Sequence, residues 1–176
     1  MMFHPLEIPG AYLLEPQRKQ DRQGFFTRSY CRQKLEERGL DPALVRSEIS
    51  VNPHRGTVQG MHYQAAPYEE SQLVRCTAGA IYDVIVDLRR DSPTFKHHVG
   101  IELSKQNRQS IYVPAGVGHG FQTLADDSEV FVQKSEFKYP ECARGVRWND
   151  PALAIEWPEE ITVISDRDQA FPDLEA

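Results

Sequence analysis

Short apolar or alternating runs separated by turn residues dominate the chain after about residue 45. Runs of this kind, bounded by Gly, Pro, Asn, Asp and Ser in segments such as AAPYEES and RRDSPTF, are typical of β-strands. Many short strands without intervening helices indicate a sandwich or barrel rather than a βαβ sheet. The expected strands are 57–63, 72–77, 80–88, 98–103, 109–113, 117–124, 129–138 and 143–147.

One helix is expected, in RSYCRQKLEERGL at about 28–38, with Gly39 as its stop signal. The fold class is therefore mainly β, and we expect a double-stranded β-helix, the cupin-like jelly roll, with this short helix near its beginning. A length of 176 residues fits one such domain over 1–176. The tapered interior of a jelly roll could hold a ligand.

Composition and charge narrow the function classes. Hydrophobic residues make up 40% and charged residues 26% of the chain, as in ordinary globular proteins. A net charge of −6, with Lys and Arg scattered along the sequence, argues against a nucleic-acid surface. The apolar run AIYDVIVDL is too short to span a membrane, and the N-terminus lacks the pattern of a signal peptide. The three cysteines of the chain are far apart and no CxxC occurs, so we expect a cytoplasmic protein with reduced thiols.

The segment GTVQGMHYQ places a histidine in an expected strand. Alternation puts Val58, Gly60, His62 and Gln64 on one face. Gln59 has the opposite parity, so it can share a pocket with His62 only if Gly60 allows a bulge or the strand ends there. The pattern alone leaves three interpretations of His62 open: a satisfied core histidine, a metal ligand or a catalytic base.

The metal interpretation finds little support in the spacing of the histidines. Metal-binding jelly rolls often place histidines at i and i+2 of one strand, and this chain has Gln64 there. His119 lies in GVGHGF with no ligand-type residue two positions away, and the adjacent His97 and His98 point to opposite faces. Because ligands must converge on an ion, we expect no bound metal, and we expect no other cofactor.

Several segments together resemble one known family. They are DRQGFFTRSY, RGTVQGMHYQ, LVRCTAGAIYDVIVDLRRDSPTF, IYVPAGVGHGFQTL, GVRWNDP and ISDRD, in collinear order over about 5–172. In this order they are similar to the dTDP-4-dehydrorhamnose 3,5-epimerase family. The resemblance implies a metal-free jelly roll, usually a dimer, acting on a nucleotide-linked 4-keto-6-deoxy sugar. It also implies an early nucleotide-recognition segment in DRQGFFTRSY.

The resemblance implies a catalytic role for His62. A 4-keto group acidifies the hydrogens on C3 and C5, and epimerisation removes one of them as a proton and returns a proton to the opposite face. That chemistry needs a base such as histidine and an orienting carboxylate that fixes its tautomer. The family pairs its HYQ histidine with the aspartate of its S-x-K/R-D motif, which correspond here to His62 and Asp168. From the residues alone, Asp168 could equally be a solvated turn carboxylate.

At four positions the chain departs from the family pattern. Gln59 stands where the family has an arginine near the diphosphate, and Gln72 where it has a lysine near the keto oxygen. Val132 stands where a tyrosine acts as the proton donor, and Arg28 where a glutamate lies close to the nucleotide. Losing an oxyanion donor costs roughly 10²–10³ in rate, and losing a general acid roughly 10²–10⁴. The departures therefore predict that the ordinary double epimerisation is slow.

Other residues are candidates for substrate binding. Arg22 and Arg167 could meet a diphosphate, and otherwise are exposed surface charges. Phe25 and Tyr139 could flank a nucleotide base or belong to the core. His119 is expected to line the pocket, although a buried hydrogen-bonded histidine is an alternative.

The expected function is epimerisation of a nucleotide-diphosphate sugar at C3, C5 or both, by a homodimer. Two alternatives stay open. One is another enolate reaction on the same kind of substrate, such as ketoisomerisation or elimination. The other is a non-catalytic relative that binds a sugar nucleotide. The retained His62 and Asp168 favour an enzyme, whereas the replaced Gln59, Gln72 and Val132 favour a binder.

Overall fold

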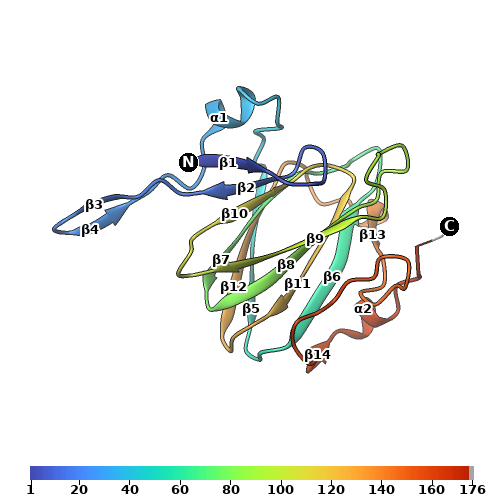
Figure 1. The fold of residues 1–176 in the computed structure, drawn as a ribbon. Coiled ribbons are helices and arrows are strands. Elements are labelled where there is room, and N and C mark those ends of the chain that lie inside the picture. The colour runs from blue at the N-terminus through green and yellow to red at the C-terminus, as the bar shows by residue number, and fades with distance from the viewer. Residues whose placement is uncertain (175–176) are drawn as a thin grey trace.

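The computed structural model describes residues 1–174, and these form two facing sheets (Figure 1). The first sheet has the order β1-β2-β10-β7-β12-β5, and the second has the order β13-β6-β11-β8-β9 with β14 beside β6. The strands are β1 (Met2–Pro5), β2 (Tyr12–Glu15), β3 (Lys19–Asp21), β4 (Gly24–Phe26), β5 (Arg46–Asn52), β6 (Thr57–Gln64), β7 (Gln72–Ala78), β8 (Ala80–Asp87), β9 (His98–Ser104), β10 (Ser110–Val113), β11 (Val117–Thr123), β12 (Ser128–Lys134), β13 (Ala143–Gly145) and β14 (Val163–Ile164). The helices are α1 (Arg32–Glu36), α2 (Asp166–Gln169) and the 3-10 turn η1 (Pro140–Cys142). The mainly β, jelly-roll class expected from the sequence is confirmed.

Apolar side chains on the inner faces of both sheets form the main core. Val74 of β7, Val130 of β12, Ile81 and Ile85 of β8 and Ile111 of β10 are all fully buried. Burying a side chain of this size stabilises the fold by about 1.5–3 kcal/mol. Side chains alternate along a strand, so the inner face of β7 also carries Gln72 and that of β12 also carries Val132 and Lys134. The interior is therefore apolar at one end of these strands and polar at the other.

Several expectations about the elements are wrong. No strand is expected before residue 57, yet β1 to β5 lie there, the strand expected at 143–147 ends at Gly145, and α2 is a second helix. The helix expected at 28–38 is only Arg32–Glu36, and Cys31 at its start provides no side-chain cap. Its stop signal is confirmed, since Gly39 has a φ of 67°. The strand expected at 129–138 ends at Lys134, where its partner strands β5 and β7 also begin.

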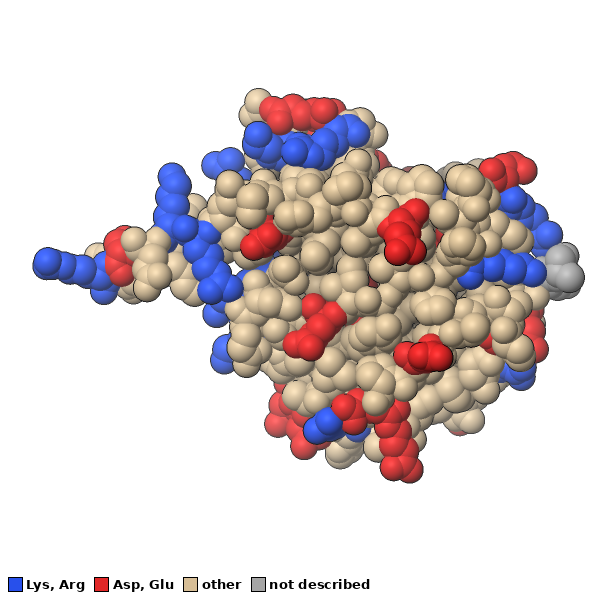
Figure 2. Space-filling view, in the orientation of Figure 1, with Lys and Arg blue, Asp and Glu red and all other residues tan. Residues whose placement is uncertain are grey.

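The hairpin of β3 and β4 projects from the body as an arm (Figure 1). Lys and Arg side chains crowd this arm, whereas acidic side chains are spread over the body on the same face of the molecule (Figure 2). No helix within residues 1–174 is long and apolar enough to cross a membrane.

Candidate active site

A cavity of about 410 Å³ opens at the polar end of the space between the sheets. Strands β5, β7 and β12 of the first sheet form one wall, and β6 and β11 of the second form the other. Its lining consists of Arg46, Glu48, Ile49, Ser50, Gln59, His62, Tyr63, Gln64, Glu70, Gln72, His119, Gly120, Phe121, Val132, Lys134, Lys138, Ala143, Arg144 and Arg167. The sequence candidates Gln59, His62, Gln72, His119, Val132 and Arg167 therefore share one cavity.

His62 lines this cavity and is hydrogen-bonded to Asp168, which lies behind the lining. Its Nε2 lies 2.7 Å from Asp168 Oδ1, and its ring packs edge-on against Phe171 at a centroid distance of 5.7 Å. The His62 side chain is 39% exposed and that of Asp168 only 4%. A carboxylate can only accept, so Nε2 carries the proton and Nδ1 keeps its lone pair free. A histidine held in this way can accept a proton at Nδ1 while the carboxylate stabilises the resulting imidazolium.

The chain brings Asp168 to His62 through β14 and α2. Strand β14 pairs in parallel with the start of β6, and α2 follows it directly, so α2 lies beside the strand that carries His62 (Figure 1). Ser165 caps α2 by accepting a hydrogen bond from the Asp168 backbone N–H at 3.1 Å. This cap fixes the start of the helix and with it the position of the carboxylate.

Both carboxylate oxygens of Asp168 are used. While Oδ1 meets His62, Oδ2 accepts a hydrogen bond from the Gly60 backbone N–H at 3.0 Å. Burial raises the pKa of Asp168, but the hydrogen bonds from His62 and Gly60 and the charge of Arg167 outweigh it, so the pKa lies below its ordinary value. Asp168 is therefore ionised at neutral pH.

A local irregularity at Gly60 allows Gln59 and His62 to face the same cavity. Gly60 has a φ of 114°, and a Cβ placed there would lie 2.6 Å from the Cα of Gly120. The pairing of β6 with β11 shifts register between His119 and Phe121. Of the two alternatives that the sequence left open, the structure therefore has an irregularity at Gly60 rather than the end of the strand, since β6 continues to Gln64. Gln59 then donates to Ser50 Oγ and to Asn52 Oδ1, at 3.0 and 2.7 Å.

A second histidine–aspartate pair lies next to the first. His119 is opposite His62 in the β11–β6 pairing, and its Nε2 lies 2.7 Å from Asp83 Oδ2. Only 9% of the His119 side chain is exposed, and Asp83 is fully buried. Burial raises the pKa of Asp83 against the opposing pull of His119. His119 thus lines the cavity and is also a buried, hydrogen-bonded histidine, so both expectations for it hold.

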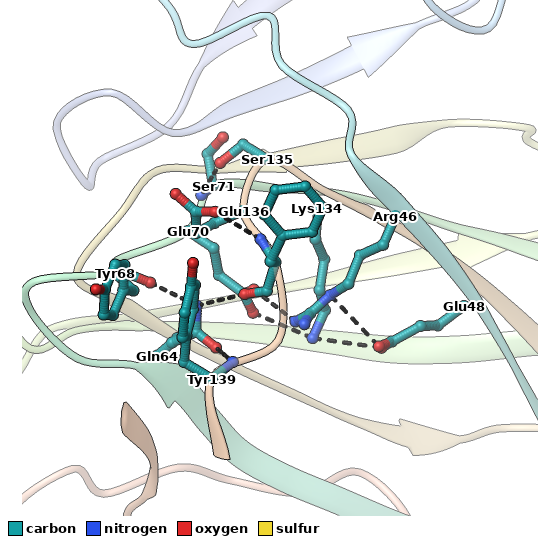
Figure 3. Close-up of polar contacts among 11 residues, drawn as sticks. Arg46, Glu48, Gln64, Tyr68, Glu70, Ser71, Lys134, Ser135, Glu136 and Tyr139 are labelled. Carbon is teal, nitrogen blue, oxygen red and sulfur yellow. Dashed lines mark hydrogen bonds and ion pairs between the residues drawn. The ribbon is translucent and has the colours of Figure 1, made fainter. Parts of the chain in front are cut away.

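Four charged side chains fill the polar end of the cavity (Figure 3). Arg46 and Glu48 come from β5, Lys134 from β12, and Glu70 from the segment before β7. Glu70 accepts a hydrogen bond from Arg46 Nη2 at 2.6 Å and forms an ion pair with Lys134 Nζ at 3.1 Å. Glu48 lies 3.5 Å from Arg46 Nε and 3.4 Å from Lys134 Nζ. Sequence reasoning missed this group, which we call the charged quartet, although the parity of Lys134 with Val132 was a usable signal.

Gln64 joins the two loop segments that contain Tyr68 and Phe137–Tyr139, beside the charged quartet. Its side-chain amide donates to the backbone oxygens of Tyr68 and Phe137 and accepts from the Tyr139 N–H (Figure 3). Tyr139 stacks on Tyr68 at a centroid distance of 3.7 Å and does not line the cavity of His62. Its role beside a nucleotide base stays a prediction.

The structure does not bring three of the expected nucleotide contacts to this cavity. Arg22 and Phe25 lie on the projecting β3–β4 arm, where Phe25 is 41% exposed beneath the guanidinium of Arg108. Arg28 lines a separate hollow of about 200 Å³ that also contains Arg75 and Arg108. Within one chain these residues therefore lie apart from His62.

Cavity geometry gives no sign of a metal centre. Among residues 1–174, no three His, Cys, Asp or Glu side chains are grouped as they would be around an ion. Gln64 is engaged with backbone groups, and His62 and His119 each face a single carboxylate.

Comparison with known proteins agrees with this geometry. The family model described as dTDP-4-dehydrorhamnose 3,5-epimerase matches residues 5–176. The chain belongs to this family. A dTDP-4-dehydrorhamnose 3,5-epimerase of Sinorhizobium fredii is 38% identical, with 99% of this chain and 90% of the relative aligned. A dTDP-4-dehydrorhamnose 3-epimerase of Streptomyces niveus is 35% identical, over 96% of this chain and 82% of the relative.

Solved structures show the same likeness. The crystal structure of dTDP-4-dehydrorhamnose 3,5-epimerase from Bacillus anthracis, with TDP and PPi bound, superposes with a TM-score of 0.94 at 40% identity. That match covers 98% of this chain and 99% of the other. The family and the fold implied by the sequence are thus both confirmed.

Proposed function

We propose that this protein epimerises a nucleotide-linked 4-keto-6-deoxy sugar, with His62 as the base and Asp168 as its orienting carboxylate. The observation that carries the proposal is the 2.7 Å hydrogen bond between them at the edge of an open cavity. Relatives across nearly the whole chain carry the names of epimerases of dTDP-linked keto sugars, which supports this substrate class.

The reaction begins with proton transfer. His62 Nδ1 takes a proton from the carbon beside the keto group, the C–H electron pair becomes a C=C bond, and the carbonyl π pair moves to oxygen as an enolate. Asp168 stabilises the imidazolium and fixes its tautomer. A proton delivered to the opposite face of the same carbon completes the inversion.

The source of that second proton determines how many carbons are inverted. Val132 lines the cavity but has no proton to donate. We propose that water reprotonates the enolate, that the hydroxide left behind is neutralised by the proton that the His62 imidazolium releases to solvent, and that the chain inverts one carbon rather than two. The existence of a 3-epimerase among the relatives supports a single inversion.

A homodimer would bring the missing nucleotide contacts to the site. Arg22 and Phe25 lie on an arm that extends away from the body of their own chain (Figure 1). Ile49 and Val51 of the edge strand β5 are 61% and 65% exposed, which is apolar surface suited to an interface. We propose that the arm of one chain reaches the cavity of another and that Arg22, with Arg167, meets the diphosphate.

The test is a proton NMR time course in D₂O with nucleotide-4-keto-6-deoxy sugars. Deuterium should enter at C3 or C5, and inversion should follow at one of them. Calorimetry against dTDP, UDP, CDP and GDP gives the nucleotide, which Arg28 in place of the usual glutamate leaves open. Absence of deuterium entry with every sugar, together with intact diphosphate binding, would favour the non-catalytic alternative that Gln72 and Val132 suggest. A product with a moved keto group would instead identify an isomerase.

A further inference from the structure

The proposed reaction places negative charge on the carbonyl oxygen of the sugar. An enzyme lowers the energy of such an enolate with donors or cations placed before the reaction starts. Gln72 lines the cavity, but its amide is neutral, and charge-assisted hydrogen bonds are about twice as strong as neutral ones. A cation from another strand would stabilise this charge more strongly than Gln72 alone.

The cations that line the cavity differ in burial and in partners. Arg144 donates to the backbone oxygens of Glu141 and Ala143, at the mouth of the cavity. Arg167 lies over the ring of Phe171 at 5.5 Å, on the side of the proton-accepting histidine. By contrast, the side chains of Arg46 and Lys134 are only 17% exposed. Lys138 also lines the cavity, but it is exposed and follows the end of β12. Among the described residues, Arg46 and Lys134 are the cations on the strands that face His62 across the cavity.

Strand register places Lys134 beside Gln72. Lys134 is opposite Gln72 in the β12–β7 pairing and opposite Arg46 in the β12–β5 pairing. Directly opposed residues have Cβ atoms about 4.5–5.5 Å apart on the same face of a sheet. Lys134 also shares its inner face with Val132, the next inward residue on β12. The ammonium group thus has access to the space that Gln72 borders.

The charged quartet holds this ammonium and leaves donors to spare (Figure 3). Lys134 meets one oxygen of Glu70 at 3.1 Å and one of Glu48 at 3.4 Å. An ammonium has three N–H donors, so one remains for a ligand. Arg46 Nη1 is buried and has no hydrogen-bond partner within residues 1–174. A buried group with surplus donors fits an oxygen acceptor with negative charge.

We propose that Lys134 donates a hydrogen bond to the keto oxygen as it becomes an enolate, and that Glu48 and Glu70 position it. Lys134 keeps its proton throughout, while His62 carries the proton taken from carbon. This role rests on the proposed function, because it requires an enolate in the cavity. The lysine would thereby supply from β12 what Gln72 on β7 cannot.

Lys134→Met tests the proposal, with Lys134→Arg as the conservative variant and the exposed Lys105→Met as a control outside the cavity. Deuterium exchange should fall by roughly 10²–10³ in Lys134→Met, the loss typical of one oxyanion donor. The Kd for the nucleoside diphosphate should change by less than about threefold, because this ligand has no keto oxygen for Lys134 to contact. Lys134→Arg should keep more activity than Lys134→Met, and Lys105→Met should match the wild type.

Gln72→Lys in the Lys134→Met background completes the test, because it returns a cation to the neighbouring strand. It should recover at least about tenfold of the lost exchange. Three results would each overturn the role of Lys134. The first is wild-type exchange in Lys134→Met, and the second is a parallel loss of diphosphate binding and thermal stability in that variant. The third is no recovery of exchange with Gln72→Lys. A wild-type protein without exchange on any sugar would overturn the proposed function itself and this role with it.

Discussion

The two histidine–aspartate pairs have the same contact and different surroundings. His62–Asp168 and His119–Asp83 both join Nε2 to a carboxylate oxygen at 2.7 Å, and the histidines are opposite each other on β6 and β11. Asp168 uses its second oxygen to accept from Gly60, whereas Oδ1 of Asp83 has no hydrogen-bond partner within residues 1–174. Consequently the pKa of Asp168 is lowered while burial raises that of Asp83.

That difference separates a base from a structural histidine. A general base needs an ionised partner to stabilise the imidazolium and an open path to the substrate. His62 has both, since its side chain is 39% exposed and Asp168 is held ionised. His119 is 9% exposed, and the ionised form of its partner is disfavoured. A contact distance alone would not distinguish the two pairs.

Replacing the histidines should give the largest difference in deuterium exchange rate between the two pairs. His62→Asn should lower deuterium exchange by roughly 10²–10⁴, the usual contribution of a general base. His119→Asn should lower it by less than about tenfold, because that side chain lines the cavity without accepting the proton. Exchange rates by NMR, at matched thermal midpoints, check both values. An equal loss in the two variants would contradict the assignment of His62 as the base.

Replacing the aspartates should have a smaller effect. Asp168→Asn leaves the imidazole in place but lets the amide stabilise the wrong tautomer, so exchange should fall by the lower end of the general-base contribution, roughly 10². Asp83→Asn should change exchange by less than about threefold, because His119 is not the base. A pH–rate profile of each variant tests this. If Asp168→Asn exchanged at the wild-type rate, the carboxylate would not orient His62.

The two carboxylates should also give opposite trends of stability with pH. The pKa of Asp168 is below its ordinary value of 3.8 in the folded state, so its contribution is present above that value and is lost as pH falls through the folded pKa. Urea unfolding from roughly pH 5 to pH 2 should show this loss in the wild type and less of it in Asp168→Asn.

Asp83 provides the contrast. Its pKa is raised in the folded state, so its contribution is present below 3.8 and is lost as pH rises through the folded pKa. Asp83→Asn should therefore gain stability relative to the wild type as pH rises from acid to neutral. A gain in the opposite direction would mean that His119 outweighs the burial of Asp83.

Metal removal should have the smallest effect on either pair. Each histidine faces one carboxylate, and the described residues contain no group of three potential ligands. Chelator treatment should leave both the exchange rate and the thermal midpoint unchanged within error. Stoichiometric metal in the purified protein, with exchange lost on its removal, would contradict this.

Local sequence patterns located most strands of the second sheet but only half of the first, because β1, β2 and β5 were not expected. Alternation and turn residues located β6, β7, β8, β9 and β11 within one or two residues, because strand periodicity and turn chemistry are local properties. The same patterns did not locate β1 to β5, nor β14 and α2, and the last two are too short to show a period. Strand β14 is held by its pairing with β6, and α2 is held by the Ser165 cap.

Sequence by itself determined which residues could act as a base, since His62 stands in a strand within a recognisable family motif. The resemblance also named Asp168 as its partner, but no pattern of the residues themselves placed that carboxylate at His62 or determined its ionisation. His62 and Asp168 are 106 positions apart, and only the pairing of β14 with β6 closes that separation. The charged quartet is likewise invisible in any single segment, because Arg46, Glu70 and Lys134 come from different strands and one loop. Cross-strand register brings such residues together, and register is a property of the whole sheet.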